Sequence, residues 1–342
     1  MRAFVYIRPQ IPLLYFVLVS KTPRKDDIQL VTYKDYYFPS TDGQSNIHVN
    51  CWFPEQAIGV VQIAHGIAEY GKRYDDFARF LCENGYAVVA NDHLGHGDSR
   101  RKNVPPLFFA EENGWMTVVD DMEALRLRTA AEFPDLPYFL FGHSMGSFLS
   151  RTYLIRYPGN LSGCILCGTG NPGTATILAG KLLASHEIKK LGKTGYSKKA
   201  DDIAFGTYNR KFAPNRTESD WISVNEDNVD AYLQDPQCGG NATIGLLQDL
   251  LDGLWFITRK KHLPSMALSM PVLFIAGQED PVGNMGKDVQ KVYRNFVAAG
   301  VKNANIKLYE GLRHEILNEK NKAEVYNDVL AWLKAQPGTI QR

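Results

Sequence analysis

The sequence predicts an α/β protein whose core is a mostly parallel β-sheet covered by helices. From residue 28 onward, short apolar segments typical of buried strands alternate with longer segments that have apolar residues at helical spacing. A chain of 342 residues, 44% of them hydrophobic, can bury a large core and suits one large domain with an insertion or two modest domains. The formal charge of +1 and the lack of an RNA- or DNA-binding motif argue against a nucleic-acid partner.

The first half of the chain shows this alternation in order. Residues 28–54 are typical of an antiparallel strand pair, with the turn-forming sequence Ser-Thr-Asp-Gly at 40–43. An apolar strand at 59–64, an amphipathic helix from Tyr74 to Asn84 and a strand at 86–90 follow. The next predicted elements are a helix at 116–133, a strand at 138–141, a helix at 145–157 and a strand at 161–167.

The pattern changes after Gly168. Residues 171–262 contain helical patterns and polar loops without clear buried strands, which predicts an insertion. The alternation then resumes with strands at 271–276 and 305–309, each followed by a helix, at about 284–299 and 319–335. We therefore expect a core formed by residues 27–170 and 263–342, interrupted by a helical segment at 171–262.

Residues 1–26 form an extension with three open interpretations. Arg2 and Arg8 precede an apolar run at 11–19, as in a secretory signal, but no small-x-small cleavage site follows. The apolar run is shorter than the roughly 20 residues that span a bilayer. The extension is a dispensable segment, a membrane-contacting anchor or an export signal.

A candidate nucleophile follows the predicted strand at 138–141. Residues 142–146 read Gly-His-Ser-Met-Gly, a Gly-x-Ser-x-Gly pattern between a strand and a helix. The two glycines allow a sharp reversal that holds the serine hydroxyl up to a substrate. An ordinary turn is the alternative, but the flanking strand and helix favour Ser144 as a nucleophile.

A serine nucleophile needs a base within hydrogen-bond reach and a carboxylate that orients the base. On α/β-hydrolase sheets the order is Ser, then Asp or Glu after a late strand, then His after the last strand. The strand at 271–276 leads to Asp280, with Glu279 as a weaker rival, and the last strand leads to His314. His262 precedes Asp280 and does not fit this order.

The reaction also needs N–H donors for the negative charge that develops on the attacked carbonyl oxygen. One candidate is the N–H of Met145, directly after the nucleophile. The strand at 59–64 leads into His65-Gly66-Ile67, which makes the Ile67 N–H the second candidate. His65 is expected to shape this loop rather than to act on a substrate.

Other chemically capable residues favour structural interpretations. Asp92, His93 and His96 could bind zinc, but Gly95 and Gly97 indicate a tight turn, and no metal is predicted. Glu69 and Arg73, four residues apart, favour a structural ion pair over a catalytic role.

The five cysteines are an odd number in a chain that needs no disulfide to hold its core, so reduced thiols are expected. Cys164 and Cys167 resemble a redox or zinc pair. They lie in an apolar strand, where positions three apart face opposite sides, which favours buried structural thiols.

The predicted insertion contains two amphipathic segments. The first carries Ile177, Leu178, Leu182 and Leu183 on one face; the second carries Leu247, Leu250, Leu251, Leu254 and Trp255. Both either pack on the core or form a lid that lines an acyl-chain channel and touches lipid. The basic residues at 259–261 either complement the end of the second helix or meet anionic head groups.

Taken together, these motifs resemble the monoacylglycerol lipase and lysophospholipase group of α/β-hydrolases, which is sometimes classed with serine aminopeptidases. The matching segments are His-Gly-Ile-Ala-Glu at 65–69 with Arg73-Tyr74, Asp-His-Leu-Gly-His-Gly-Asp-Ser at 92–99, Gly-His-Ser-Met-Gly-Ser at 142–147, the Asp280 loop, and residues 310–315. The resemblance covers residues 28–336. It implies a sheet of about eight strands, a helical cap between the sixth and seventh, and an acyl-enzyme route without metal or organic cofactor.

The sequence therefore predicts a serine ester hydrolase that acts on monoacylglycerol or a lysophospholipid. In this prediction Ser144, His314 and Asp280 are catalytic, and Ile67 and Met145 donate to the oxyanion. A small-ester carboxylesterase or an aminopeptidase would keep these residues, and a non-catalytic binding protein on the same scaffold is an alternative of another class. We expect a cytoplasmic location, with transient lipid contact through the cap and with export as an open alternative.

Overall fold

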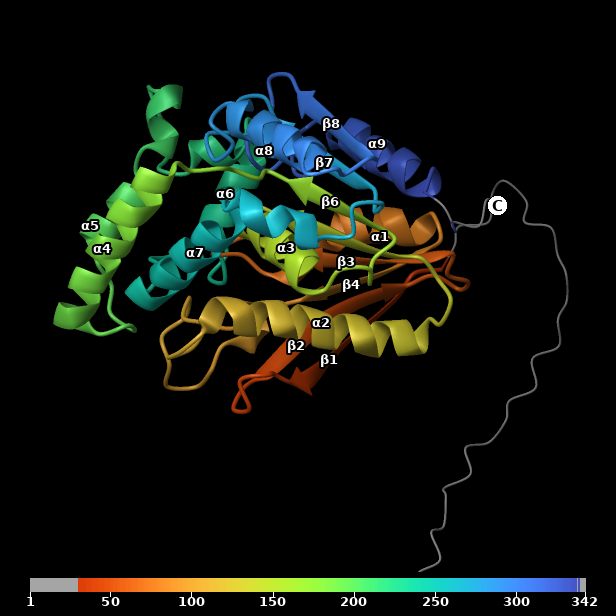
Figure 1. The fold of residues 1–342 in the computed structure, drawn as a ribbon, viewed down its shortest axis with the longest axis horizontal. Helices are drawn as coiled ribbons and strands as arrows, with labels where there is room; N and C mark the ends of the chain where they lie inside the picture. The colour runs from red at the N-terminus through yellow and green to blue at the C-terminus, as the bar shows by residue number, and fades with distance from the viewer. Residues whose placement is uncertain (1–29, 337, 339–342) are drawn as a thin grey trace, which may run out of the picture.

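A computed structural model describes residues 30–336 and 338, and it contains one eight-stranded sheet with the order β1-β2-β4-β3-β5-β6-β7-β8 (Figure 1). The strands are β1 (Thr32–Pro39), β2 (Asn46–Phe53), β3 (Gly59–Ala64), β4 (Tyr86–Asn91), β5 (Tyr138–His143), β6 (Gly163–Cys167), β7 (Val272–Gly277) and β8 (Ala304–Tyr309). Strand β2 pairs antiparallel with β1 and β4, and all other pairs are parallel. The predicted fold class is confirmed.

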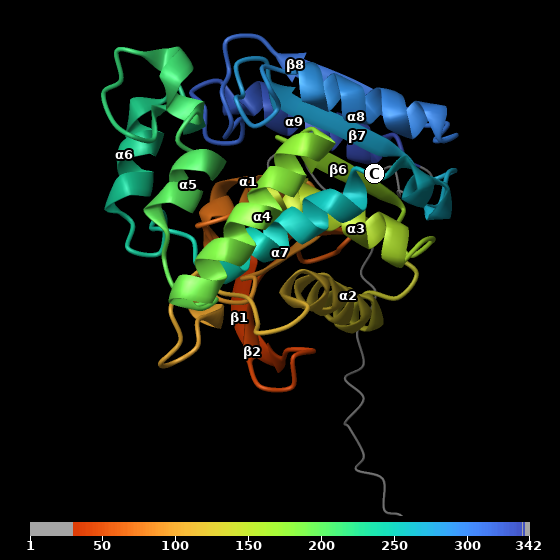
Figure 2. The same cartoon turned by 60° about the vertical axis from the view of Figure 1, so that its left-hand side comes forward.

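Helices cover both faces of the sheet (Figures 1 and 2). One apolar core contains residues of α1 (Asp75–Glu83) and α9 (Lys322–Lys334). The other contains residues of α2 (Gly114–Glu132), α3 (Met145–Arg156) and α8 (Lys287–Ala298). Strand residues alternate between the two cores, as a two-sided buried sheet requires.

Strand β6 shows this alternation at the cysteine pair. Cys164 belongs to the core beneath α2 and α3, whereas Cys167 belongs to the core beneath α1 and α9. Both thiols are buried and free. The prediction that these cysteines face opposite sides of a strand is confirmed, and this separation leaves them unable to act as a pair.

Between β6 and β7 the described chain forms only helices and loops. The elements are α4 (Thr174–Leu191), α5 (Lys198–Ala204), η3 (Tyr208–Phe212), η4 (Asp220–Ile222), α6 (Glu226–Gln234), α7 (Ile244–Ile257) and η5 (Lys260–Ser265), where η denotes a 3₁₀ helix. We call this segment, residues 171–262, the cap. It lies at one end of the sheet (Figures 1 and 2).

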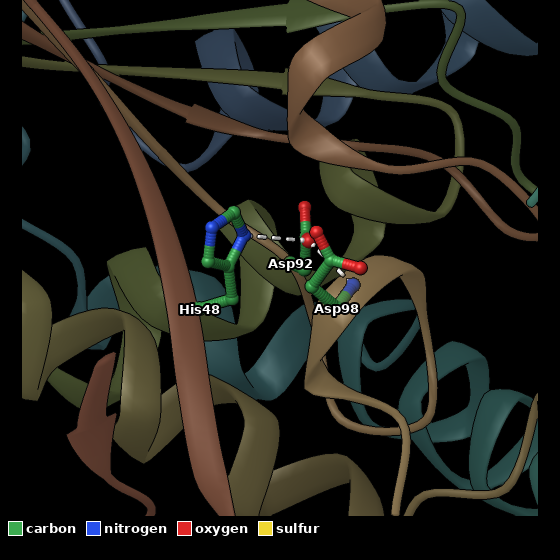
Figure 3. Close-up of side chains that lie close together, drawn as sticks. All are labelled: His48, Asp92 and Asp98. Carbon is green, nitrogen blue, oxygen red and sulfur yellow. Dashed lines mark hydrogen bonds and ion pairs between the residues drawn. The ribbon is translucent and has the colours of Figure 1, made fainter. Parts of the chain in front are cut away.

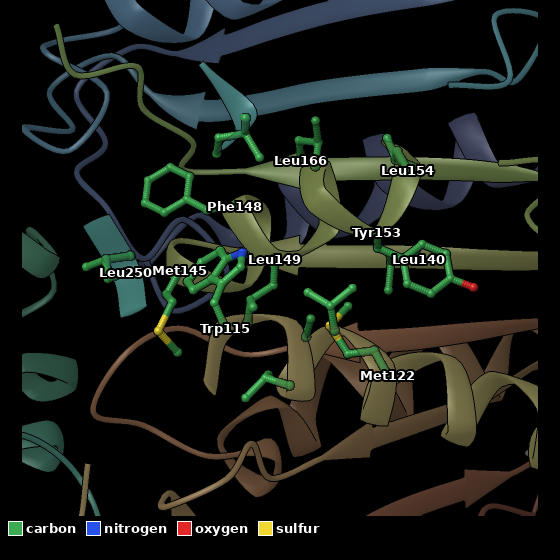
Figure 4. Close-up of a cluster of buried hydrophobic side chains, with 14 of the residues drawn as sticks. Trp115, Met122, Leu140, Met145, Phe148, Leu149, Tyr153, Leu154, Leu166 and Leu250 are labelled. Atoms are coloured by element: carbon green, nitrogen blue, oxygen red, sulfur yellow. The ribbon is translucent and has the colours of Figure 1, made fainter. Parts of the chain in front are cut away.

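The two amphipathic segments of the cap behave differently. Helix α7 packs on the core, where Leu250 joins the cluster around Trp115, Met145 and Phe148 (Figure 4). Gly253 lies so close to Trp115 that an added Cβ would come within 2.0 Å of the indole. Of the four residues on the predicted apolar face of α4, only Ile177 is fully buried, and Leu182 is 75% exposed. The α4 stripe is therefore not a core face.

In the described part of the chain, no helix is both long and apolar enough to cross a bilayer. The apolar run at 11–19 lies outside the described residues, as does the rest of the predicted extension at 1–26.

Candidate active site

The turn between β5 and α3 has the strained geometry of a nucleophile elbow. Ser144 has φ 51° and ψ −121°, a backbone conformation that a residue with a side chain adopts only when its surroundings enforce it. The Ser144 N–H donates to the Cys167 carbonyl at 3.0 Å, which ties the elbow to β6. The sharp turn points the chain from the sheet directly into α3.

The two glycines of the elbow are required by close packing. A Cβ at Gly142 would lie 2.3 Å from Ser150 Oγ, and a Cβ at Gly146 would lie 2.0 Å from the Ala64 carbonyl oxygen. Because both distances are shorter than any real contact, larger residues would push α3 away from β3 and β5. The Gly-x-Ser-x-Gly pattern thus reflects helix-to-strand contact at this site.

Asp280 and His314 meet at the carboxyl ends of β7 and β8. Nδ1 of His314 lies 2.9 Å from Oδ2 of Asp280, and both side chains are buried. The other carboxylate oxygen of Asp280 accepts a hydrogen bond from the Val282 N–H at 2.8 Å. Since a carboxylate only accepts, this arrangement places a proton on Nδ1 and leaves Nε2 of His314 unprotonated in the neutral ring. Glu279, the rival acid, makes no such contact.

Ser144 and His314 line the same cavity, which has a volume of about 690 Å³. Gly168, at the end of β6, packs against the imidazole, and a Cβ there would lie 3.0 Å from its Cε1 atom. Among the described residues, no hydrogen bond joins the Ser144 hydroxyl to the imidazole. Catalytic hydrogen bonds of this kind commonly tighten only when substrate binds.

Of the two predicted oxyanion donors, Ile67 lines this cavity, and Met145 directly follows Ser144, which also lines it. Met145 is the first residue of α3, so its N–H has no acceptor within the helix. Ile67 lines the cavity beside Gly66, where an added Cβ would lie 3.1 Å from Ser144 Cβ. The loop after β3 therefore reaches the nucleophile, as the order of motifs implied.

Glu69 and Arg73 form the expected ion pair, at 3.0 Å, within a larger buried network. Oε1 of Glu69 also accepts hydrogen bonds from the Gly66 N–H and the Tyr74 hydroxyl, and it lies 3.1 Å from Nδ1 of His143. The Arg73 guanidinium also donates two parallel hydrogen bonds, of 2.8 and 2.9 Å, to the Glu315 carboxylate. This network joins the loops that carry Ile67, Ser144 and His314.

Within this network, His143 contacts the candidate base. Its Nε2 atom is 3.3 Å from the His314 carbonyl, and the two imidazole rings lie 4.7 Å apart. Burial disfavours the cation, but the hydrogen bond and charge of Glu69 raise the pKa of His143. Burial likewise opposes ionisation of Glu69, yet the His143 hydrogen bond and the Arg73 charge lower its pKa to about 2.

Sequence reasoning missed His143 and Glu315 as parts of the site. Their positions in the sequence could have indicated both residues, because His143 directly precedes Ser144 and Glu315 directly follows His314.

The three histidines at 65, 93 and 96 form a buried cluster of rings. His65 lies 4.1 Å from His93 and 5.3 Å from His96, measured between ring centroids. Nε2 of His65 accepts the His93 N–H at 2.9 Å, and Nδ1 of His96 lies 2.9 Å from the Leu94 carbonyl. Burial lowers the pKa of all three histidines, that of His96 to about 4. These neutral rings fix the loops at 65–67 and 92–97.

Among the described residues, the one group with metal-ligand spacing is His48, Asp92 and Asp98 (Figure 3). Both carboxylate oxygens of Asp92 are already engaged, because they accept hydrogen bonds from the N–H groups of Gly71 and Asp98 at 2.7 and 2.8 Å. Oδ2 of Asp92 also lies 3.0 Å from Nδ1 of His48. This donor set fits a carboxylate that anchors two loops better than it fits a metal ligand.

Comparison with known proteins agrees with this geometry. The family model described as "Serine aminopeptidase, S33" matches residues 55–321. The chain is 29% identical over 299 residues to a monoacylglycerol lipase of Mycolicibacterium smegmatis. The alignment covers 85% of this chain and 94% of the relative. It is 26% identical over 329 residues to the human monoglyceride lipase, with coverage of 94% and 97%.

Solved structures show the same fold. A thermostable carboxyl esterase from Bacillus coagulans in complex with glycerol superposes with a TM-score of 0.79 at 28% identity, covering 88% of this chain and 98% of the esterase. A soluble variant of the Saccharomyces cerevisiae monoglyceride lipase superposes with a TM-score of 0.71 at 20% identity, covering 94% and 99%. The chain therefore belongs to the serine aminopeptidase S33 family, among the serine hydrolases of the lipase and esterase group that have the α/β-hydrolase fold.

Proposed function

We propose that the protein hydrolyses carboxylic esters through an acyl-enzyme, with Ser144 as nucleophile, His314 as general base and Asp280 as the residue that orients the base. The observation that carries this proposal is the buried contact of 2.9 Å between His314 Nδ1 and Asp280, at a cavity that also holds the strained Ser144. Asp280 keeps the proton on Nδ1, so Nε2 is free to accept the serine proton.

The reaction proceeds in two halves. The Ser144 oxygen attacks the ester carbonyl while its proton moves to Nε2 of His314, and the proton then passes to the departing alcohol. Water enters, gives a proton to Nε2 and attacks the acyl-enzyme, which releases the carboxylic acid and restores Ser144. In both tetrahedral intermediates the N–H groups of Ile67 and Met145 donate to the oxyanion.

For the substrate, we propose a monoacylglycerol or a lysophospholipid. The relatives named monoacylglycerol lipase and monoglyceride lipase support a glyceride, and a relative named phospholipase, 25% identical over 287 residues, supports a phospholipid. The cavity volume of about 690 Å³ is large enough for an acyl chain with a small head group.

The cap supplies a surface suited to lipid. Of the large exposed hydrophobic residues in the described chain, those on the cap are Leu178, Leu182, Leu191, Tyr196, Ile203, Val224 and Leu233. The predicted acyl-channel helices α4 and α7 contribute no described residue to the cavity wall, whereas α5 and the stretch from 205 to 242 do. We propose that α4, which we call the outer cap, contacts the lipid surface and that α5 and this stretch guide the acyl chain to Ser144.

One observation favours a second activity, aminopeptidase cleavage. Asp201 and Glu218 line the cavity, and no described hydrogen bond or ion pair engages either carboxylate. Burial is the largest contribution to the raised pKa of Asp201. Carboxylates in this place could hold the amino terminus of a peptide.

Steady-state kinetics would separate these functions. We would measure kcat/KM on p-nitrophenyl esters of increasing acyl length, on monoacylglycerols, on lysophospholipids and on amino-acid p-nitroanilides, each with Ser144→Ala as the control. The lipid proposal predicts that kcat/KM rises with acyl length and that Ser144→Ala abolishes turnover. A flat or falling trend would remove the lipid substrate. Faster anilide than ester cleavage, lost in Asp201→Asn with Glu218→Gln, would establish the aminopeptidase.

A further inference from the structure

Part of the cap is bound tightly to the loop that carries His314. The N–H of Glu315, the residue after His314, donates to the Ile222 carbonyl at 2.7 Å. The buried carboxylate of Glu319 accepts hydrogen bonds from the Ser223 hydroxyl at 2.8 Å and from the Val224 and Asn225 N–H groups at 3.1 to 3.2 Å. We call cap residues 220–228 the inner cap; it cannot move without moving the histidine loop.

The inner cap places an aromatic ring against the candidate base. The indole of Trp221 lies 5.2 Å from the imidazole of His314, between ring centroids, with 38° between the ring planes. The backbone N–H of Trp221 donates to Asn209 Oδ1 at 2.9 Å, and its ring packs on Tyr208 at 5.0 Å. Trp221 is thus held on both sides, by the cap and by the histidine loop.

The imidazole needs such contacts. Its single side-chain hydrogen bond, at Nδ1, fixes the distance to Asp280 but leaves the ring plane free to tilt about that bond. In the structure no hydrogen bond to Ser144 fixes the other side, so packing has to set the direction of Nε2. Among the described residues, the two rings within stacking distance of His314 are His143, from the strand of the nucleophile, and Trp221, from the cap.

We propose that Trp221 is a positioning residue for the reaction: it holds the imidazole of His314 so that Nε2 faces Ser144, and it makes the inner cap part of the catalytic machinery. This inference depends on the proposed function, in which His314 is the base. Burial and the nearby charge of Asp280 raise the pKa of Tyr208 to about 12, so the ring on which Trp221 packs also lies near the candidate acid.

The test compares Trp221→Leu with Trp221→Phe, using a short soluble ester that needs no lipid surface. Misplacement of the base predicts that kcat falls by about 10- to 100-fold in Trp221→Leu, with KM changed by less than about threefold. Phenylalanine keeps a ring in the same place and should restore kcat to within about threefold of the parent. Trp332→Leu, on α9 and packed on Phe139 rather than on the site, is the control.

A second measurement does not depend on activity. The indole shifts the proton resonances of the His314 ring by its ring current, and the shift should be absent from Trp221→Leu and present in Trp332→Leu and in Ser144→Ala. Loss of this shift with unchanged kcat, an equal kcat loss in the Leu and Phe variants, or an increase in KM alone would each overturn the positioning role. If the parent protein hydrolysed no ester, the proposed function would fail while the ring contact could still be tested.

Discussion

The inner and outer parts of the cap are held in place in different ways. The inner cap, residues 220–228, is joined to the histidine loop by buried hydrogen bonds to Glu319 and Glu315. The outer cap, α4, lies at the edge of the molecule away from the sheet and exposes Leu178 and Leu182 (Figure 1). Polar contacts hold the inner cap in one place, whereas the exposed apolar side chains of the outer cap have no partner within the described chain.

This difference indicates a division of labour. A segment that touches the candidate base must be rigid, because an error of about 1 Å in the position of a catalytic group can cost about 100-fold in rate. A segment that meets a lipid surface needs exposed apolar area and tolerates movement. We therefore expect changes in the inner cap to alter the rate on every substrate, and changes in the outer cap to alter only the rate on lipid aggregates.

The largest effect is expected at Asp280, and its loss of kcat is the reference against which changes in the inner and outer cap can be compared. Asp280→Asn keeps the shape but offers an amide N–H₂ group or a weaker acceptor to Nδ1, which favours the wrong tautomer of His314. We expect kcat to fall by roughly 10³- to 10⁴-fold while the melting temperature changes little. Glu279→Gln is the matched control. Near-normal turnover in Asp280→Asn would transfer the role of acid to another residue.

In the inner cap we expect an intermediate effect from Glu319→Ala. This change removes the acceptor of four backbone and hydroxyl donors, at Arg313, Ser223, Val224 and Asn225, and frees the inner cap from the histidine loop. The kcat on a soluble ester should fall by about 10-fold because both Trp221 and His314 lose their support. Glu324→Ala, an exposed acid on α9, should leave kcat unchanged. An unchanged kcat in a folded Glu319→Ala protein would show that the two halves of the cap do not differ in this way.

In the outer cap, Leu178→Ser combined with Leu182→Ser should act only at a lipid surface. The variant removes two exposed apolar side chains, so hydrolysis of monoacylglycerol in vesicles should slow by about three- to tenfold, while kcat/KM on a soluble ester stays the same. The matched control is Leu127→Ser with Val297→Ser, which removes two exposed apolar residues from α2 and α8. Equal losses on both kinds of substrate would assign α4 to folding or to the cavity instead.

The smallest effect on catalysis is expected in α7, which seats the cap on the core, where a substitution should change stability alone. The carboxylate of Asp249 faces the start of α2, where an added Cβ at Gly114 would lie 2.2 Å from its Oδ2 atom. Burial, with a contribution from Asp252, raises the pKa of Asp249 to about 7. The folded protein therefore holds this proton more tightly than the unfolded chain does, and stability from this group falls as pH rises from about 4 to 7.

Asp249→Asn should remove this loss. The free energy of unfolding of the variant, relative to the parent, should increase by about 3 kcal/mol between pH 4 and pH 7, with no change in kcat. Urea denaturation at a series of pH values would measure it. A constant difference across this range would show that Asp249 does not titrate there.

Much of the fold could be predicted because its signals are local. The buried strands are recognisable as apolar runs, and the elbow is recognisable because it requires Gly142 and Gly146 beside Ser144. Composition and spacing are therefore enough to place both the strands and the elbow. The order of the strands in the sheet and the exposure of Leu182 are set by contacts between distant segments, which no local pattern records.

The same distinction applies to the site. Ser144, Asp280 and His314 follow strands in a fixed order, and the motif order alone was enough to nominate them. Trp221 and Glu319 carry no local signal for their roles, because the contacts that join the inner cap to the histidine loop, Trp221 with His314 and Glu319 with Ser223, span more than 90 residues in sequence. Their importance arises only when the cap folds back onto the histidine loop.

The central claim is that Ser144 becomes acylated. The most direct measurement is mass spectrometry of the intact protein and of its peptides after exposure to a fluorophosphonate and, at low pH, to a slowly hydrolysed p-nitrophenyl ester. We expect one added group per chain, located on Ser144, that forms much more slowly in His314→Gln and not at all in Ser144→Ala. Modification of a different residue, or an unmodified protein that still turns over ester, would contradict it.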